Sequence, residues 1–503
     1  MSGWSGWDAI TPREWQRVRR YAVPGWMIAE CTEARERGDW RAACAAAAVD
    51  VTFASPGPAA EMLAGFAPDL LRWHLPRALG GTTMLDPDRA FVLAPDGPVH
   101  ADTVVLVVRT PPSAEHAQRL TLDAVRAGDV EGDVVFPLPP HLWDARRAGE
   151  LREVARAVRL PPSADWTEAW ATSEWRFGVR SPGDFHLLRR VDPTFAGREV
   201  RRVAAQFGRT SWALWSDAYR RSDVRLEVDG DGVRVVELSL GRLQPNPFRA
   251  VPCLHLGLLC APIDLNLLHL GLISPEGLHP LVREALTPDD PGGPVSSPVT
   301  AGFDEEDLVR VRCGGVWHWV GVRAARLELH EHSREERQRE LSLRALGGAV
   351  TGCFAVAEHW RHGGSLPKRL RAHRRDLWLR LRHGGTRVLL ALLDAGLDPH
   401  VRDGAGRTLL HELGRFDVSV LPRLLAEGLL VNARDRDGNT PLFLAVSRRW
   451  PTPMVTALVD AGASPHIVNR NRMSVLDQCG VMESRDDLAP EWAAAIAYVR
   501  EKA

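Results

Sequence analysis

The sequence is poor in lysine and has no long uninterrupted hydrophobic run. Only Lys368 and Lys502 are lysines among its 63 basic residues, so arginine carries nearly all of the positive charge, as expected from a GC-rich genome rather than from a guanidinium-specific function. The formal net charge of −1 excludes a global attraction to nucleic acid or acidic lipid. The longest apolar stretch, residues 254–263, is too short and too interrupted to span a bilayer.

Cysteine is scarce and scattered. The chain has seven cysteines, an odd number, and no two are spaced as C-x-x-C, which argues against a disulfide framework and against a zinc site. We therefore expect buried free thiols in a reducing cytoplasm. Residues 1–15 lack the charged start and apolar run of an export signal, which predicts a cytoplasmic protein with no membrane partner.

The common catalytic motifs are missing as well. The sequence contains no G-x-S-x-G, no G-x-x-x-x-G-K-[ST] and no H-E-x-x-H. Two histidine pairs, His330 with His332 and His359 with His362, could each supply two metal ligands, but no third and fourth ligand is spaced nearby. The sequence therefore gives no catalytic residue, no cofactor and no metal site, and it favours a non-enzymatic protein while leaving an enzyme open.

What the sequence does contain is an internal repeat between residues 403 and 466. Thr408 and Thr440 lie 32 residues apart, and Gly428 and Gly462 lie 34 apart. A period of this length is typical of a solenoid built from pairs of helices. Such a pair cannot bury its apolar side alone, so its leucines are expected to face the next repeat.

The letters of one repeat suit the positions they occupy. Thr440 can cap the first helix by accepting a hydrogen bond from a free backbone N–H, and Pro441 follows at the first helical position. Gly428 and Gly462 can end the second helix in the left-handed conformation. The D-x-x-G stretches then predict tight turns that project between neighbouring repeats.

The stretch from Asp435 to Ala445 reads D-x-x-G-x-T-P-L-F-x-A and resembles the ankyrin repeat, whose hallmark is D-x-x-G-x-T-P-L-H-x-A. The preceding repeat keeps His411. An earlier helix pair lies at 377–399, and a fourth, shorter repeat begins at Asn469. Phrases elsewhere, such as RGDWRAACAAAAVDV and GLHPLVREAL, also resemble actinomycete ankyrin-repeat proteins with no assigned activity.

Before the repeats, alternation and turn chemistry predict a mixed region of helices and β-hairpins. Hairpins are expected at 91–108, 224–238 and 308–322, and helices at 12–20, 25–37, 144–159, 167–176, 197–207 and 212–221. The predicted fold is thus an α+β N-terminal region followed by a C-terminal all-α ankyrin-type helical solenoid. The expected divisions are an α+β region at 1–332 with a mobile loop at about 287–302, a helical bridge at 333–370, repeats at 371–480 and a capping helix at 481–503.

One segment departs from the neutral charge of the chain. Residues 361–387 contain nine basic side chains and a single acidic one. They could form a solvated helix face, contact an acidic protein, or grip the phosphates of a nucleic acid. The central members of this basic strip are Lys368, Arg369, Arg371, Arg374, Arg375, Arg380 and Arg382.

The resemblance implies a protein partner, because ankyrin-type stacks bind proteins through turn tips and inner helices. The residues expected at these places are Glu412, Arg415, Arg448 and Arg449 on inner helices, Arg436, Asp437 and Arg470 at tips, and Trp450 as an anchor if exposed. We therefore predict a non-enzymatic adaptor, scaffold or regulatory protein. The alternatives are an enzyme or effector whose α+β region is targeted by the repeats, and a nucleic-acid-associated regulator acting through the basic strip.

Overall fold

The computed structural model divides the chain into two compact units, of which the first comprises residues 1–114 and 118–297 and the second residues 115–117 and 298–503. The described residues are 5–6, 11–78, 83–131, 135–157, 175–177, 191, 193–215, 224–230, 232–237, 252–259, 262–289, 298–300, 306–323, 326–484 and 488–503. Within these residues no helix is both long enough and apolar enough to cross a membrane.

The first unit contains two five-stranded mixed sheets. One has the strand order β2-β6-β5-β4-β7 and the other the order β12-β9-β10-β11-β8, while β1 (Ser5–Gly6) pairs with β3 (Arg77–Ala78). The strands of the first sheet are β2 (Val49–Val51), β4 (Ala90–Leu93), β5 (Val104–Arg109), β6 (Leu120–Arg126) and β7 (Val135–Pro137). Those of the second are β8 (Trp175–Phe177), β9 (Ser211–Trp215), β10 (Val224–Asp229), β11 (Gly232–Glu237) and β12 (Cys253–His255).

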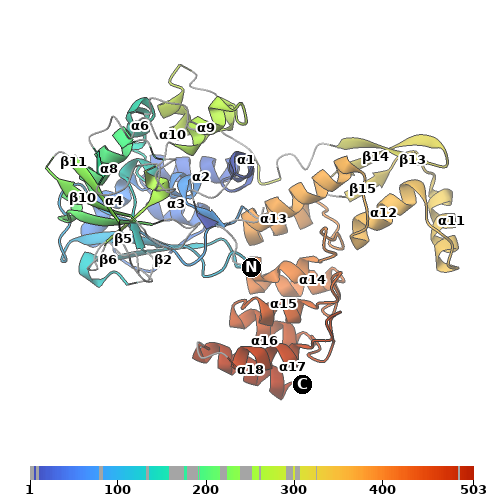
Figure 1. Ribbon diagram of the computed structural model, residues 1–503. Coiled ribbons are helices and arrows are strands. Elements are labelled where there is room, and N and C mark those ends of the chain that lie inside the picture. Colours follow the sequence, from blue (N-terminus) through green and yellow to red (C-terminus); the bar gives the residue numbers. More distant parts are fainter. Residues whose placement is uncertain are drawn as a thin grey trace. The chain divides into compact units, whose positions relative to one another are not determined.

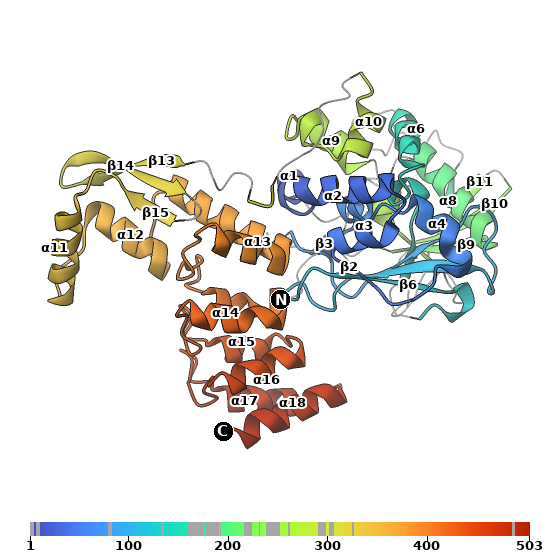
Figure 2. The same cartoon turned by 180° about the vertical axis from the view of Figure 1, so that it is seen from behind.

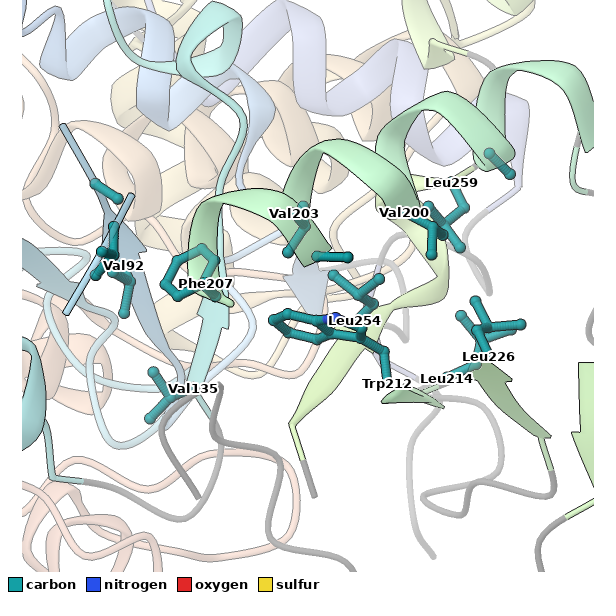
Figure 3. Packing of buried hydrophobic residues seen from close by; sticks show 14 of the residues in the cluster. Val92, Val135, Val200, Val203, Phe207, Trp212, Leu214, Leu226, Leu254 and Leu259 are labelled. Carbon is teal, nitrogen blue, oxygen red and sulfur yellow. The ribbon is translucent and has the colours of Figure 1, made fainter. Parts of the chain in front are cut away.

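The two sheets contribute to one apolar core. Val92 of the first sheet and Trp212 and Leu254 of the second belong to the same buried cluster. Figure 3 shows side chains of helix α8 (Pro193–Phe207) lying over those of β9 and β12, with Phe207 and Trp212 in an edge-to-face contact at 6.0 Å. Buried valines and a leucine at every second position of β10 and β11 supply this core: Val224, Leu226, Val233 and Val235.

The other α-helices among the described residues of the first unit are short, and the predicted positions of several are confirmed. Thr11 caps α1 and forms a reciprocal pair with Glu14, as a capping box requires. The predicted hairpins at 91–108 and 224–238 are confirmed by antiparallel pairing of β4 with β5 and of β10 with β11. These helices are α1 (Pro12–Tyr21), α2 (Gly25–Glu36), α3 (Trp40–Ala46), α4 (Ala60–Gly65), α5 (Pro68–His74), α6 (Leu151–Ala157), α9 (Ile263–His269) and α10 (Pro280–Leu286).

The helix predicted at 212–221 is wrong over its described part. Residues up to Trp215 form strand β9, in which Trp212 and Leu214 both enter the core. That spacing of two is the period of a strand, and the tertiary core overrides the helical pattern. The helix predicted at 167–176 lies outside the described residues except at its end, where Trp175 begins strand β8. Most of the loop predicted at 287–302 also lies outside them.

The second unit begins with a three-stranded antiparallel sheet of order β13-β14-β15. Its strands are β13 (Asp307–Cys313), β14 (Val316–Arg323) and β15 (Arg326–Leu329), which confirms the predicted hairpin. Helix α11 (Arg334–Ala345) follows and has no buried residue, and α12 (Gly352–His362) then packs against β13 and β15.

Helix α13 (Lys368–Asp394) contains a break at Gly385, where the φ angle is 60°, so it is a pair of helices joined end to end. The helix pair predicted at 377–399 is therefore present, but its first helix begins at Lys368, before that range, and its second ends at Asp394. Beyond it, Figures 1 and 2 show α14, α15 and α16 lying one above another, with α17 and α18 at the end of the stack. The helices after α13 are the 3₁₀ helices η9 (Leu409–Arg415) and η10 (Val418–Val420), and the α-helices α14 (Leu421–Ala426), α15 (Pro441–Ser447), α16 (Thr452–Asp460), α17 (Val475–Glu483) and α18 (Pro490–Glu501).

The predicted helix ends are confirmed as well. Thr440 accepts a hydrogen bond from the backbone N–H of Phe443 at 3.2 Å and so caps α15. Gly428 and Gly462 take φ angles of 86° and 87° just after α14 and α16, as a left-handed helix end requires.

Candidate protein-binding site

Three turns of the second unit share one backbone scaffold. A side-chain oxygen of Asp403, Asp435 or Asn469 accepts hydrogen bonds from two backbone N–H groups of its own turn, all between 2.8 and 3.0 Å. Each of these bonds mimics a backbone turn and holds the loop in a fixed shape. The third turn uses an asparagine where the first two use aspartate, and its geometry is the same.

The fourth position of each turn has a positive φ angle. Gly406 and Gly438 have φ angles of 78° and 79°, and Arg472 occupies the matching place in the last turn with a φ of 59°. Glycine adopts this conformation without steric cost, whereas arginine does not. The shared scaffold therefore imposes the left-handed conformation even where the sequence has lost its glycine.

Neighbouring turn tips are joined by their main chains. The N–H of Arg436 donates to the carbonyl of Ala405 at 2.9 Å, and the N–H of Arg470 donates to the carbonyl of Asp437 at 2.8 Å. The side chains of Arg436, Asp437 and Arg470 are exposed. The predicted tip residues therefore lie in a row of turns that are joined by main-chain hydrogen bonds. Their side chains take no part in these hydrogen bonds.

The inner-helix candidates Glu412 and Arg415 are buried, with exposed fractions of 2% and 4%. The carboxylate of Glu412 accepts hydrogen bonds from Arg415 Nε at 2.6 Å and from Arg382 Nη2 at 2.7 Å. Burial alone would raise the pKa of Glu412, but the two guanidinium groups outweigh it and lower the pKa to about 2. These residues form an internal ion-pair cluster that links α13 to η9, and their role is structural.

His411 links one repeat to the next. Its Nδ1 accepts from the backbone N–H of Thr408 at 3.1 Å, so Nε2 carries the hydrogen that is donated to the carbonyl of Asn439, also at 3.1 Å. Burial lowers the pKa of His411 to about 4, which keeps the ring neutral at physiological pH. The histidine of the repeat motif is thus a connector between repeats.

Trp450 is 1% exposed, so the condition under which it was expected to anchor a partner is not met. Its ring lies against Gly414, where a Cβ atom would come within 2.7 Å of the indole. The large side chain fits because the facing residue has none. Trp450 therefore fills the space between two repeats.

Arg448 and Arg449 are half-buried and contact residues 115–117, which belong to the second unit. The guanidinium of Arg448 forms an ion pair with Glu115, and Arg415 lies 3.6 Å from the same carboxylate. The Nε2 of His116 hydrogen-bonds the carbonyl of Arg449 at 2.7 Å. An acidic side chain from a distant part of the sequence is thus already bound at this place.

The basic strip is divided by the fold. Arg374 is buried and donates to the carbonyl of His359 at 3.3 Å. Ion pairs to acidic residues engage Arg369, Arg380 and Arg382. Along the described chain, the strip members that are exposed without an acidic partner are Lys368, Arg371 and Arg375.

Four potential metal ligands converge elsewhere in the second unit. Cys313, His318, His332 and Cys353 each offer one ligand atom, and these atoms all lie within 4.8 Å of one another. Sequence spacing had supplied no third and fourth ligand for His332, but the fold brings them in from two strands and a helix. The expectation of no metal site rested on sequence spacing alone, and the fold supplies a set of four ligands that spacing did not reveal. His330 belongs to a separate, more exposed group with Glu306 and Glu328.

The first unit has a small pocket lined by Arg19, His74, His141 and Asp264. Asp264 accepts from Arg19 Nε at 2.6 Å and from Trp73 Nε1 at 3.1 Å, so its charge is satisfied internally. Burial lowers the pKa of His141 to about 4 and that of His74 well below its ordinary value, which leaves both rings neutral. We assign no reaction to this pocket.

Sequence reasoning found the turn tips because their scaffold recurs at a fixed period. It did not find Glu115, and of the four convergent ligands it named only His332, because contacts across such sequence separations leave little trace in the local sequence. Cys313 stands just before a Gly-Gly turn and Cys353 just after a glycine, and these neighbours were the available signal.

Residues 437–470 match the family model described as ankyrin repeat. A stretch of 70 residues is 39% identical to an ankyrin repeat-containing protein of Schizosaccharomyces pombe, covering 14% of this chain and 34% of that protein. The chain thus spans about a third of the length of this curated relative. The ankyrin resemblance of the C-terminal region is confirmed, and ankyrin repeats generally mediate protein–protein interaction.

Proposed function

From the premise that the C-terminal region carries ankyrin repeats, we propose that the chain is a non-enzymatic adaptor or regulatory protein. Its repeats form a short solenoid that binds another protein through the turn tips. The observation that carries this proposal is the row of tips whose main chains are bonded to one another while Arg436, Asp437 and Arg470 project exposed side chains. A stiff frame that presents variable side chains loses little conformational entropy when it binds.

The charge of this surface favours an acidic partner. Arg436 and Arg470 project from successive tips, and Arg472 is exposed beside them. The binding of Glu115 by Arg448 is an internal example of how a carboxylate engages the arginines of these repeats. We expect the partner to present aspartate or glutamate side chains to the tips. Arginine can bind such a carboxylate through two hydrogen bonds at once, so replacing the tip arginines with lysine should weaken binding.

Affinity capture with the full-length chain, read by mass spectrometry, tests this proposal. The Arg436→Ala, Arg470→Ala double variant removes two tip side chains but leaves the main-chain bonds of both tips intact, so it is expected to fold and to lose the captured partner. The matched control is Arg423→Ala, Arg500→Ala, which removes two exposed arginines from helices α14 and α18.

Unchanged capture by the tip variant would contradict the proposal. Nuclease treatment before capture distinguishes this proposal from the alternative of a nucleic-acid-associated regulator. Proteins that are captured only through bound nucleic acid would be lost after the treatment. A third variant, Lys368→Ala with Arg371→Ala and Arg375→Ala, tests the exposed remainder of the basic strip and is expected to capture the same partner as the wild type.

A further inference from the structure

We propose that Cys313, His318, His332 and Cys353 form a structural zinc site that holds together the module of residues 306–362. Cys313 ends β13, His318 lies on β14, His332 follows β15, and Cys353 is the second residue of α12. Two thiolates and two imidazoles make a complete tetrahedral ligand set with no open position, which is the pattern of structural zinc.

The distances agree with such a site. Bond lengths of about 2.0–2.3 Å to zinc place neighbouring ligand atoms about 3.3–3.8 Å apart in a tetrahedron. The four atoms in this structure lie within 4.8 Å of one another, and His318 Nδ1 is 2.9 Å from His332 Nε2. Small side-chain movements are enough to bring all four to the zinc distances.

Cys353 can approach Cys313 because the residue before it, Gly352, has no side chain. Gly352 has a φ angle of 59°, and a Cβ atom there would lie 2.4 Å from the sulfur of Cys313. Gly314 and Gly315 form the hairpin turn with φ angles of 57° and 90°, the conformation that matches the twist of paired strands. Because Cys313 pairs with Val316 in the ladder, Cys313 and His318 lie on the same face of the sheet.

The surroundings also suit a ligand histidine. The Nδ1 of His332 faces the carboxylate of Glu336 at 3.5 Å, on the side of the ring opposite to Nε2. Zinc-bound histidines commonly direct their second nitrogen to a carboxylate, which fixes the ring and its tautomer. Ser333 and Glu336 form the capping box of α11, so the carboxylate is itself held in place, and the ring of Phe354 packs at 4.6 Å from that of His332.

The module needs an additional stabilising element because its own core is small. Helix α11 buries no residue, and the sheet has only three strands. Segments with so small a core usually rely on metals, disulfides or association with other parts of the protein. Apart from the four ligands, the buried apolar side chains among the described residues of the module are Val309, Val311, Val320, Val322, Leu329, Val356 and Trp360.

Metal analysis of the full-length chain, purified without chelators, is the first test. We expect about one zinc ion per chain in the wild type, and a loss of most of that zinc in Cys353→Ser and in His318→Ala. Two matched controls should keep it: Cys479→Ser, which changes a buried cysteine in helix α17, and His330→Ala, which changes the histidine two positions before a ligand.

Cobalt substitution of the wild type gives a test that does not depend on the folding of a variant. Tetrahedral Co²⁺ with two sulfur ligands should give strong visible absorption and a thiolate-to-cobalt band in the near ultraviolet. Wild-type protein that binds neither ion, unchanged zinc in both ligand variants, or a Cys313–Cys353 disulfide in place of metal would overturn the proposal.

Discussion

The repeats and the 306–362 module are stabilised in opposite ways. In the repeats, the same backbone bonds recur from turn to turn, and the side-chain oxygens of Asp403, Asp435 and Asn469 fulfil one role three times. In the module, a few side chains from separate elements converge at one point. A repeated scaffold tolerates the replacement of one motif residue, as at Arg472, whereas a convergent site depends on each of its side chains.

The largest effect expected in the repeats comes from the ion-pair cluster of Glu412, Arg382 and Arg415, where side chains from separate elements also meet at one point. Replacing Glu412 with Gln leaves the guanidinium groups of Arg382 and Arg415 without their shared carboxylate. We expect a loss of about 3 kcal/mol in the free energy of unfolding of this region, since the two buried guanidinium groups keep only their longer ion pairs, with Asp403 at 3.4 Å and with Glu115 at 3.6 Å. Hydrogen exchange of residues 377–484, followed by mass spectrometry, would measure it.

The matched control for that substitution is Glu427→Gln, which removes an acid paired with Arg423 on an exposed helix surface. Its exchange rates should match those of the wild type, because exposed pairs contribute little to stability. Equal rates in both variants would show that the Glu412 cluster does not hold the repeats together.

Acidification should weaken the repeats by a similar mechanism. The folded chain lowers the pKa of His411 from its ordinary value of 6.5 to about 4, so the stability that depends on the neutral ring is complete above pH 6.5 and is lost as the pH falls towards 4. We expect a decrease of about 3 kcal/mol over that range. Glu412, with a pKa of about 2 against an ordinary 4.5, adds a further loss between pH 4.5 and 2.

Urea denaturation at a series of pH values would measure this dependence. His411→Asn removes the titrating ring, so the part of the slope between pH 6.5 and 4 that belongs to His411 should disappear in that variant. An identical slope in the two proteins would assign the acid sensitivity to other groups.

In the module, the substitution that matters most should be Gly352→Ala, because a methyl group there overlaps the sulfur of Cys313. Gly347 also has a positive φ, of 84°, but a Cβ atom at that residue meets no other atom within 4 Å. Both alanines strain the backbone, so their difference isolates the overlap with Cys313. We expect Gly352→Ala to cost about 1–3 kcal/mol more than Gly347→Ala in thermal unfolding of the chain. Equal costs would mean that the two elements are free to move apart.

The smallest expected effect is a gain. Arg472→Gly relieves a left-handed arginine and should stabilise the last turn by about 1 kcal/mol, whereas Gly438→Ala places a side chain in the same conformation one repeat earlier and should cost a similar amount. The thermal unfolding midpoints of the two variants should therefore move in opposite directions. A decrease in both would show that the last turn does not follow the scaffold of the others.

The same contrast explains what could be predicted from the sequence. The roles of Thr440, Pro441 and Gly438 could be predicted because each residue acts on the backbone next to it, and the neighbouring sequence is enough to recognise such a role. The burial of Trp450 depends on Gly414 in another repeat, and the strand conformation of Trp212 depends on a sheet assembled from distant segments. Local patterns do not specify such partners, and the division of the chain into region, bridge, repeats and cap stays a prediction.

The main-chain bonds between successive turn tips have a consequence for how this protein can change over time. Arg436 and Arg470 hold neighbouring turns through their peptide N–H groups, which every residue except proline possesses. Mutation can therefore replace the outward-pointing side chains one after another while the loops keep their positions. A lineage can in this way acquire new binding preferences without passing through an unfolded intermediate sequence.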